Sequence, residues 1–473
     1  MKVCVLQPDY STTDVDYKNY DPPRDLSALL QGDEVDHVFL NKLTTYKQLK
    51  ELSTADYDIY VNLCEGYLEW SVPSIEVPYY LDLLQLPYTG PNVTIYDPSK
   101  EIMKYVAFTA GVSTPAFALL NPFSNIQKET EHLRYPLFVK PAKAGDSLGI
   151  DELSCVLNTE QLAAKTSTLF KEYKELIIEE YIEGREFTVL VVAEDDKKKC
   201  FVYKPLEYVF DNNAHYKTYA QKTRELHPSA NVPCNEPLVE KKLIDAAYAI
   251  FTAFEGVGYA RLDFRLDVSG NLFFLEINFT CSVFYVNGYE GSADYILNNH
   301  PLGTRGFLQK IIAEGISRHQ QKCKPYKVQG NSLAGFGLYS TKNILPGALI
   351  FEGEGKAQRL ITRQFVKTQW SAGQQEVFRR YAYPLSSEVF LLWDKDPMNW
   401  LPQNHSCAAN TYYEGLNVYA SGYIEKGEEL TLDYSTFLNE EMEPFECHCG
   451  EANCRGWITG IPGNSVTARE ESK

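Results

Sequence analysis

The sequence predicts a multidomain protein that is mixed α/β and α+β over its first two thirds and rich in β-strands over its last third. Chain length is the first observation, because 473 residues correspond to about three folding units at roughly 100 to 200 residues per domain. The second is patterning: strand-like apolar runs alternate with helix-like segments up to about residue 318, whereas short strands and many glycines follow residue 326.

Composition excludes several classes of protein. The content of 44% apolar and 23% charged residues is typical of globular proteins, and 63 acidic against 45 basic residues give a net charge of -18, which argues against a broad nucleic-acid surface. No apolar stretch approaches the roughly 20 residues that span a bilayer, and the N-terminus lacks a signal-peptide pattern. We therefore expect no membrane or direct nucleic-acid binding, and an intracellular protein, cytoplasmic or nuclear, that is not secreted.

The first 92 residues predict a small parallel α/β domain. Apolar runs at 2–6 and 57–63 are typical of strands, with helix-like polar segments between them. A helix is predicted to follow the boundary, with Ser99 as its N-cap and Gly111 just beyond its C-terminus.

Residues 93–318 predict an α+β domain. The strand-like runs are 137–139, 176–178, 187–192, 259–266 and 272–277, and helices are expected around 159–171 and 236–254. The following stretch is polar and ends in a proline, which predicts a linker over 319–325.

Basic and acidic side chains in this domain suggest bound phosphates and a metal. The basic side chains are Lys104 and Lys140. Glu276 and Asn278 share one face of a predicted strand because side chains alternate, and a hairpin could bring Asp263 beside them. Three oxygen ligands would suit Mg²⁺. Each acid taken alone can equally be a solvated surface carboxylate.

Residues 60–318 resemble an ATP-grasp ligase of the D-alanine–D-alanine ligase type. The resemblance rests on the motifs at 99–104, 110–115, 135–141, 145–150 and 179–188. The family's roles, carried onto this sequence, make Arg261 face the transferring phosphoryl group and Asp263, Glu276 and Asn278 bind Mg²⁺. The ATP contacts that the resemblance implies are Lys104, Lys140, Ser147, Glu179, Tyr181, Ile182, Glu186 and Lys217.

The resemblance implies that ATP activates a carboxylate, which an amine then attacks. The departures from the family pattern fall where its substrates bind: Asp146 replaces the first serine of a pair, and 278–282 replaces Asn-Thr-Ser-Pro-Gly. The N-terminal domain also lacks the family's glycine-rich entry motif. D-alanine is therefore not the expected substrate, and other small carboxylates and amines are.

Three closely spaced cysteines, Cys447, Cys449 and Cys454, predict a metal site, because three thiolates at this spacing can hold one Zn²⁺. The other eight cysteines are scattered singly and are typical of small buried residues. A reduced cluster without metal is the alternative.

The last third resembles the SET and post-SET segments of protein lysine methyltransferases. The resemblance rests on the segments 334–339, 344–347, 404–410 and 427–434 followed by the cysteine cluster. It implies a SET domain over 326–435, a zinc-binding post-SET segment over 436–460 and a flexible tail over 461–473. In families with this pattern the cysteine of Asn-His-Ser-Cys, here Cys407, completes the zinc site.

The reaction implied is methyl transfer from S-adenosylmethionine to an amine in a narrow channel. Tyr434 is the predicted catalytic residue, which orients the amine. The cofactor contacts that the resemblance implies are Phe336, Gly337, Leu338, Asn404 and His405. His405 can also be a purely structural histidine, and Tyr381 and Tyr383 can line the channel or simply pack.

Two features bear on the methyl acceptor. Leu432 stands where related enzymes often carry a Phe or Tyr that limits methylation, which predicts addition of more than one methyl group. Acidic residues from Glu425 to Glu446 suggest a rim that attracts a basic peptide, such as a histone-like lysine substrate, although a solvated face is the simpler interpretation.

The leading hypothesis is a bifunctional enzyme, in which an ATP-dependent carboxylate–amine ligase is joined to a methyltransferase that uses S-adenosylmethionine. Its cofactors are S-adenosylmethionine, ATP, Mg²⁺ and Zn²⁺. In one alternative only the methyltransferase is active and the ATP-grasp region is a docking or nucleotide-sensing module. In another the SET region is a zinc-stapled binding domain.

Overall fold

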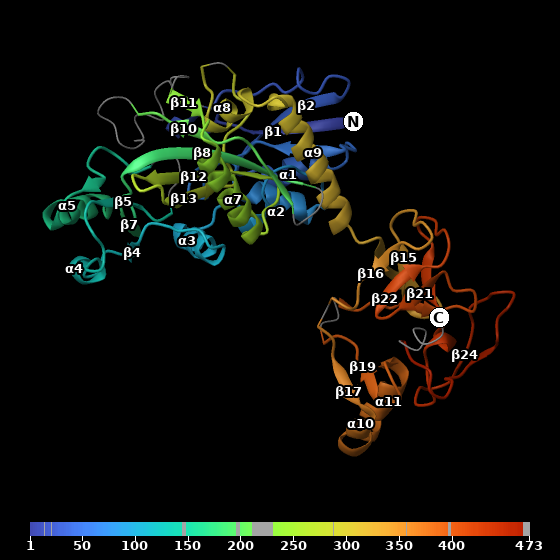
Figure 1. Cartoon of the computed structure of the whole chain (residues 1–473). Coiled ribbons are helices and arrows are strands. Elements are labelled where there is room, and N and C mark those ends of the chain that lie inside the picture. The colour runs from blue at the N-terminus through green and yellow to red at the C-terminus, as the bar shows by residue number, and fades with distance from the viewer. Residues whose placement is uncertain are drawn as a thin grey trace. The chain divides into compact units, whose positions relative to one another are not determined.

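The computed structural model divides into two compact units, Met1–Gln321 and Lys322–Lys473, each of which is described by itself (Figure 1). The described residues are 1–13, 15–19, 21–143, 148–194, 199–210, 230–286, 288–355, 357–395 and 399–466, without the side chains of 16 and 17.

The first unit begins with a parallel sheet in the order β2-β1-β3, as the alternation of strands and helices predicts. The central strand β1 is buried along almost its whole length because it has a neighbour on both edges. The elements are β1 (Lys2–Pro8), η1 (Asp16–Asn19), β2 (Glu34–Leu40), α1 (Thr45–Leu52), β3 (Ile59–Asn62) and α2 (Glu76–Leu83).

Two antiparallel sheets follow, in the orders β4-β7-β5-β6 and β11-β10-β8-β12-β13, with β9 paired to β8. The strands of the first are β4 (Phe117–Leu120), β5 (Leu137–Pro141), β6 (Cys155–Val156) and β7 (Leu176–Glu180). Those of the second are β8 (Gly184–Ala193), β9 (Cys200–Val202), β10 (Leu206–Tyr208), β11 (Asn231–Pro233), β12 (Tyr259–Asp267) and β13 (Leu272–Asn278). All five predicted strands are thus confirmed.

The helices of this unit confirm the predicted signals. The Ser99 hydroxyl caps α3 by accepting from the Ile102 N–H, and Gly111 follows the helix with a φ of 77°. Helices α5 and α7 form where they were expected, with Pro237 at the first turn of α7. The helices are η2 (Val93–Ile95), α3 (Lys100–Thr109), α4 (Ile126–Glu129), α5 (Thr159–Leu169), α7 (Pro237–Ala253), α8 (Ser292–Asn298) and α9 (Gly303–Lys322).

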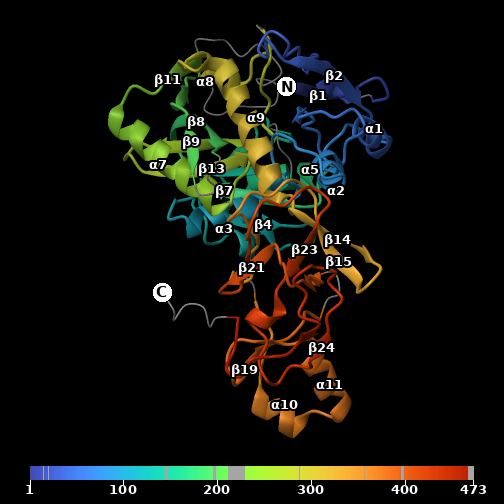
Figure 2. The same ribbon diagram turned by 90° about the vertical axis from the view of Figure 1, so that its right-hand side faces the viewer.

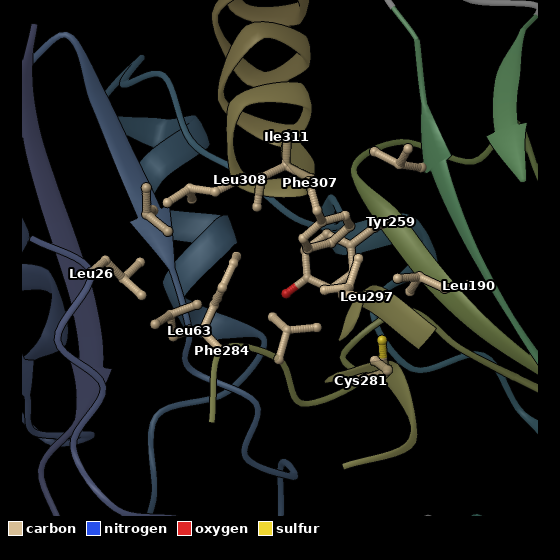
Figure 3. Packing of buried hydrophobic residues seen from close by; sticks show 14 of the residues in the cluster. Leu26, Leu63, Leu190, Tyr259, Cys281, Phe284, Leu297, Phe307, Leu308 and Ile311 are labelled. Carbon is tan, nitrogen blue, oxygen red and sulfur yellow. The ribbon is translucent and has the colours of Figure 1, made fainter. Parts of the chain in front are cut away.

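One hydrophobic core joins the segments on either side of residue 92. In Figure 3, Phe307, Leu308 and Ile311 of α9 point between Leu63 on one side and Tyr259 on the other. The predicted boundary at 92 therefore separates two sequence segments that share a core, within one compact unit.

The predicted linker over 319–325 is partly helical, because α9 continues to Lys322. Arg318 fixes this last part of the helix, since its guanidinium donates to the carbonyl oxygens of Tyr88 at 2.6 Å and Gly90 at 2.9 Å. The long polar side chains that suggested a linker lie on the outer face of a packed helix.

The second unit is rich in short strands, as predicted. Its largest sheet has the order β14-β15-β23-β21-β22-β16, with β20 paired to β23, and two smaller sheets are β17-β19-β18 and β24-β25. The strands of the largest are β14 (Tyr326–Asn331), β15 (Gly335–Ser340), β16 (Leu349–Phe351), β20 (Asn404–His405), β21 (Thr411–Glu414), β22 (Asn417–Ala420) and β23 (Glu429–Leu432). The others are β17 (Leu360–Thr362), β18 (Tyr383–Pro384), β19 (Val389–Leu391), β24 (Phe445–Glu446) and β25 (Trp457–Ile458).

Two helices, α10 (Arg363–Gln369) and α11 (Ala372–Tyr381), lie together with the β17-β19-β18 sheet at one end of this unit (Figure 2). Val366 of α10 and Phe378 of α11 pack into a core that also contains Phe390 of β19. A short 3-10 helix, η5 (Tyr434–Thr436), follows β23.

The first part of the predicted flexible tail over 461–473 contacts the rest of the second unit. Val466 is buried in the same core, its N–H donates to the Pro384 carbonyl, and the Ile461 N–H donates to the Leu438 carbonyl. The polar composition of 461–473 concealed this one apolar anchor. Residues 467–473 lie outside the described part.

Among the described residues, no helix combines the length and the apolar character that crossing a bilayer requires.

Candidate active sites in the two units

The main cavity of the first unit lies between the two antiparallel sheets. It is lined by residues of β5, β7, β8, β12 and β13, so segments far apart in the sequence meet there. The lining residues are Lys100, Pro115, Phe138, Lys140, Leu148, Ile150, Glu179, Glu180, Tyr181, Ile182, Glu186, Arg261, Asp263, Arg265, Leu275, Glu276 and Ser292. Basic and acidic groups thus face one space.

Glu179 balances two buried lysines at this wall. Its carboxylate lies 2.5 Å from Lys104 Nζ and 2.7 Å from Lys140 Nζ. Burial alone would raise the pKa of Glu179, but the charges of Lys104 and then Lys140 outweigh it and lower the pKa to about 2. The carboxylate is therefore fully ionised at neutral pH, and the cluster carries a net positive charge.

The structure places Lys100, rather than Lys104, at the cavity wall. Both lie on the inner face of α3 one turn apart, but Lys104 does not line the cavity, whereas Lys100 does and forms an ion pair with Glu276 Oε2 at 3.1 Å. The sequence prediction named Lys104 as an ATP contact and did not name Lys100, the other member of this i, i+4 pair. Helical spacing alone makes the two positions equivalent, because residues four apart share a helix face.

The predicted metal ligands sit on a β-hairpin. Asp263 and Glu276 are direct partners across β12 and β13, and Arg261 and Asn278 are partners two residues away along the same strands. Asp263 Oδ1 is buried without a hydrogen-bond partner, which fits an oxygen ligand for a cation such as Mg²⁺.

Asn278 is a less direct fit as a metal ligand. It lines a smaller adjacent cavity together with Glu276, and its Oδ1 accepts from the N–H of Thr280 at 2.9 Å. Arg261 donates to Asp263 Oδ2 at 3.1 Å, so the predicted catalytic arginine and the first metal ligand are in contact.

The predicted adenine and ribose contacts, Tyr181, Ile182 and Glu186, also line the cavity. Sequence reasoning missed Arg265, which lies among them. Its guanidinium carbon is 4.8 Å from the centre of the Tyr181 ring, and it donates to the Ile182 carbonyl at 2.7 Å and to Glu186 at 3.1 Å. The alternation along β12 that puts Arg261 and Asp263 on one face extends to Arg265, and this was the available signal. Two predicted ATP contacts, Ser147 and Lys217, lie outside the described residues.

We expect Glu179→Gln to destabilise the first unit by about 3–5 kcal/mol at pH 7, because it leaves Lys104 and Lys140 buried without a counter-charge. Calorimetric unfolding of the full chain measures the effect. The matched control is the double variant Lys104→Met/Glu179→Gln, which also removes one cation and should recover part of the loss.

The same carboxylate predicts a dependence on pH. Its pKa of about 2 in the folded protein lies below the ordinary value of 4.5, so its stabilisation is present above pH 4.5 and is lost as pH falls towards 2. The advantage of the wild-type protein over Glu179→Gln should therefore shrink in acid. Equal stabilities at pH 7 would contradict the assignment.

In the second unit the four predicted zinc ligands converge. The sulfur atoms of Cys407, Cys447, Cys449 and Cys454 all lie within 4.8 Å of one another, and Cys407 Sγ is 3.9 Å from Cys447 Sγ. A tetrahedral site with Zn–S bonds of about 2.3 Å has sulfurs about 3.8 Å apart. The donor set and its spacing fit one structural Zn²⁺.

Tyr434 lies near this cluster and is surrounded by aromatic rings. Its hydroxyl donates to the Gln403 carbonyl at 2.6 Å and hydrogen-bonds to Tyr383. Burial raises its pKa well above the ordinary value, so the hydroxyl keeps its proton at neutral pH. Phe437 and Phe445 pack against the ring, with centroids 5.4 and 5.9 Å away.

Tyr383 thus contacts the predicted catalytic tyrosine, whereas Tyr381 is largely exposed with its ring centroid 6.4 Å from that of Trp393. A carbonyl oxygen and two hydroxyls lie together among aromatic rings, and such a set of groups suits a neutral amine.

The predicted S-adenosylmethionine contacts are joined by a residue that was not assigned to the site. Glu429 accepts hydrogen bonds from Asn404 Nδ2 at 2.7 Å and from Asn331 Nδ2 at 2.9 Å, and Asn404 also donates to the Phe336 carbonyl at 3.0 Å. A Cβ atom at Gly337 would lie 2.4 Å from Glu429 Oε1, so a side chain there would have to displace the Glu429 carboxylate from Asn404. This close backbone cradle fits the expected cofactor.

Two of the predicted contacts can act only through their backbone or indirectly. Leu338 is fully buried in a core of the second unit. The His405 ring is also buried, and it accepts from the Tyr434 N–H through Nδ1 at 3.1 Å. The His405 side chain thus has a buried hydrogen bond within the protein, as expected of a structural histidine.

Part of the suggested acidic rim is neutralised by cations within the second unit. Glu441 pairs with Arg363 and Lys367, and Glu443 pairs with Arg380. Asp433 pairs with Arg455, and Glu429 points inward to the asparagines named above. Sequence reasoning counted the acids and missed these cations, which come from distant segments.

The fold and the cavity between its two antiparallel sheets define the class of the first unit, an ATP-grasp fold, and family models agree. The model described as "D-ala D-ala ligase C-terminus" matches residues 105–283, and the model of the SET domain matches residues 335–435. The matched ranges fall within the α+β region and the β-rich region that the sequence predicts.

Curated relatives confirm the family. A D-alanine–D-alanine ligase of Bacillus velezensis is 30% identical over 256 residues, which are 51% of this chain and 68% of that protein. One from Thermoanaerobacter sp. is 28% identical over 263 residues, 52% of this chain and 68% of its own length. The chain belongs to the D-alanine–D-alanine ligase family, and it carries a SET domain in addition.

A solved structure agrees on the fold. The D-alanine–D-alanine ligase from Bacillus anthracis complexed with ATP has a TM-score of 0.50 at 19% identity, and the match covers 68% of this chain and all of that one.

Proposed function

We propose that this protein is a bifunctional enzyme, an ATP-dependent carboxylate–amine ligase joined to an N-methyltransferase that uses S-adenosylmethionine. The observation that supports the ligase half is that one cavity is lined both by basic and by acidic side chains. They are Lys100, Lys140 and Arg261, and Asp263 and Glu276. Those that carry the methyltransferase half are the hydrogen-bonded Tyr434 hydroxyl among aromatic rings and the close approach of Glu429 to the backbone at Gly337.

In the ligase half, a substrate carboxylate oxygen attacks the γ-phosphorus of ATP, and ADP leaves. An amine then attacks the activated carbonyl carbon, so that an amide forms and phosphate departs with the transferred oxygen. The lysines and Arg261 stabilise negative charge as it moves between phosphate oxygens. Mg²⁺, when bound by Asp263 and Glu276, supplies further neutralising charge.

The acid and the amine are proposed to differ from D-alanine. Segment 278–282 is tied back to the N-terminal sheet, because Ser282 Oγ donates to Glu65 at 2.6 Å. Glu65 in turn accepts from Arg24 at 3.1 Å, and Arg24 is also paired with Asp21. This buried ionic network is in contact with segment 278–282, where the sequence departs from the family pattern.

In the methyltransferase half, the lone pair of a neutral amine attacks the sulfonium methyl group, the carbon–sulfur bond breaks, and S-adenosylhomocysteine leaves. The methylated amine loses a proton to water. Tyr434 and the Gln403 carbonyl orient the nitrogen, and the aromatic walls exclude water. Zn²⁺, when bound by the four cysteines, supplies structural rigidity.

The test incubates the full chain with ATP, Mg²⁺, labelled S-adenosylmethionine and pools of amino acids, peptides and histones. ADP release and methyl incorporation are followed separately. Substrate-dependent ADP release and incorporation of label are the expected results. Absence of the first signal with every pool would refute the ligase, and absence of the second would refute the methyltransferase.

The alternative is that the first unit binds nucleotide without ligation, as a sensing or docking module for an active SET domain. The Arg24 network favours it, because this buried arginine is already paired with Asp21 and Glu65 and so is not offered to a second substrate. Nucleotide binding without substrate-dependent ADP release would favour this alternative.

Leu432 predicts multiple methylation. Its side chain is buried and apolar, so it offers no hydroxyl to hold a water molecule beside the amine. We expect di- or trimethylated products in the mass spectrum of a methylated peptide. Leu432→Tyr should shift the products towards monomethylation, and strict monomethylation by the unchanged protein would contradict the prediction.

A further inference from the structure

The sulfur of Cys407 lies at a meeting point of three N–H donors. The backbone N–H and the Nε–H of Arg455 both donate to Cys407 Sγ at 3.4 Å. His405 Nε2 lies 3.5 Å from the same sulfur. Because the Tyr434 N–H occupies His405 Nδ1, the proton of the neutral ring is on Nε2, which therefore donates to the sulfur.

His405 and Arg455 also form hydrogen bonds to Tyr434 and to the residues on either side of it. His405 holds the Tyr434 N–H at 3.1 Å. Arg455 donates through Nη2 to Asp433 Oδ1 at 2.6 Å and through Nη1 to Ser435 Oγ at 2.5 Å. The residues before and after Tyr434 are thus held by one guanidinium.

The position of this guanidinium depends on the cysteine cluster. Arg455 directly follows Cys454, and the cluster joins two segments that are otherwise distant, 404–407 and 447–454. A bound metal fixes both segments and keeps Cys407 as a thiolate, and hydrogen bonds to a charged acceptor are roughly twice as strong as neutral ones. The Arg455–Asp433 pair is partly exposed, so alone it holds the segment only weakly.

We propose that Arg455 and His405 couple the zinc site to the methyl-transfer site, so that zinc occupancy orders the segment Asp433–Ser435 and positions Tyr434. Arg455 is a positioning residue in this account, since it acts through the residues that flank Tyr434. The inference rests on the proposed role of Tyr434, but the coupling itself is measurable without a methyl acceptor.

The test is hydrogen exchange of the amides at 433–437 in the full chain, together with zinc content by mass spectrometry. We expect zinc-loaded wild-type protein to protect the Tyr434 amide and Arg455→Met to retain zinc while exchanging about tenfold faster there. Removal of zinc with a chelator should abolish protection in both. Arg380→Met is the matched control, because Arg380 pairs with Glu443 in the same unit and touches no cysteine.

A second variant keeps the test valid if Arg455→Met loses zinc. Asp433→Asn touches no sulfur and weakens the far end of the bridge together with the Asp433 cap on the Ser435 N–H, so it should keep zinc and still raise exchange at Tyr434. Unchanged exchange in a zinc-loaded variant, or protection that survives zinc removal, would overturn the inference. A protein without methyltransferase activity that shows zinc-dependent protection would refute the proposed function and support the coupling.

Discussion

Lys140→Met is expected to lower ATP-dependent ADP release by about 10²–10³-fold and to leave methyl incorporation unchanged. Lys140 lines the cavity between the two antiparallel sheets, and in the proposed function its charge faces the phosphates of ATP. Removing one preorganised charge of this kind typically costs that much in kcat. Steady-state ADP formation under saturating Mg²⁺ measures the effect.

The variant should still fold. Glu179 keeps its ion pair with Lys104 at 2.5 Å, so one acid and one base remain balanced after the substitution. Lys310→Met is the matched control, because Lys310 pairs with Glu194 in the same unit and does not line the cavity. ADP release that survives Lys140→Met would remove this cavity as the nucleotide site.

Tyr434→Phe is expected to lower methyl incorporation by about 10²-fold while ADP release continues. The substitution removes the hydroxyl that bonds to the Gln403 carbonyl and to Tyr383, so the amine loses its alignment with the methyl group. A misplacement of about 1 Å costs a factor of this size. Incorporation of label from S-adenosylmethionine into the acceptor found in the pools measures the effect.

Binding of S-adenosylhomocysteine should change little in Tyr434→Phe, because the cradle at Gly337 and Asn404 is untouched. Tyr412→Phe is the control for loss of a tyrosine hydroxyl elsewhere in the second unit, since Tyr412 lies in β21 and stacks on Tyr419 with centroids 6.0 Å apart. An unchanged methylation rate in Tyr434→Phe would exclude this tyrosine from the mechanism.

Local patterns in the sequence predicted most of the fold. Apolar runs predicted the strands β5, β7, β8, β12 and β13. Ser99 and Gly111 predicted the two ends of helix α3. The end of α9 and the anchor at Val466 did not follow, because both depend on tertiary contacts that polar composition conceals. Sequence shows which face of an element is apolar but not what covers it.

Sequence also predicted some residues of the candidate sites and missed others. The four cysteines were predicted together, because ligand chemistry and spacing restrict which groups can share a metal. Lys100, Arg265, Glu429 and Arg455 were missed as site residues because each acts through a partner from a distant segment. Their roles depend on distances that no spacing rule contains.

The central claim is that one chain contains two separate sites, one for a nucleotide with Mg²⁺ and one for S-adenosylmethionine. Calorimetric titration of the full chain with a non-hydrolysable ATP analogue plus Mg²⁺, and with S-adenosylhomocysteine, tests it most directly. The account predicts one site for each ligand and a dissociation constant for each that does not change when the other is bound. Failure of either ligand to bind, or competition between the two, would contradict it.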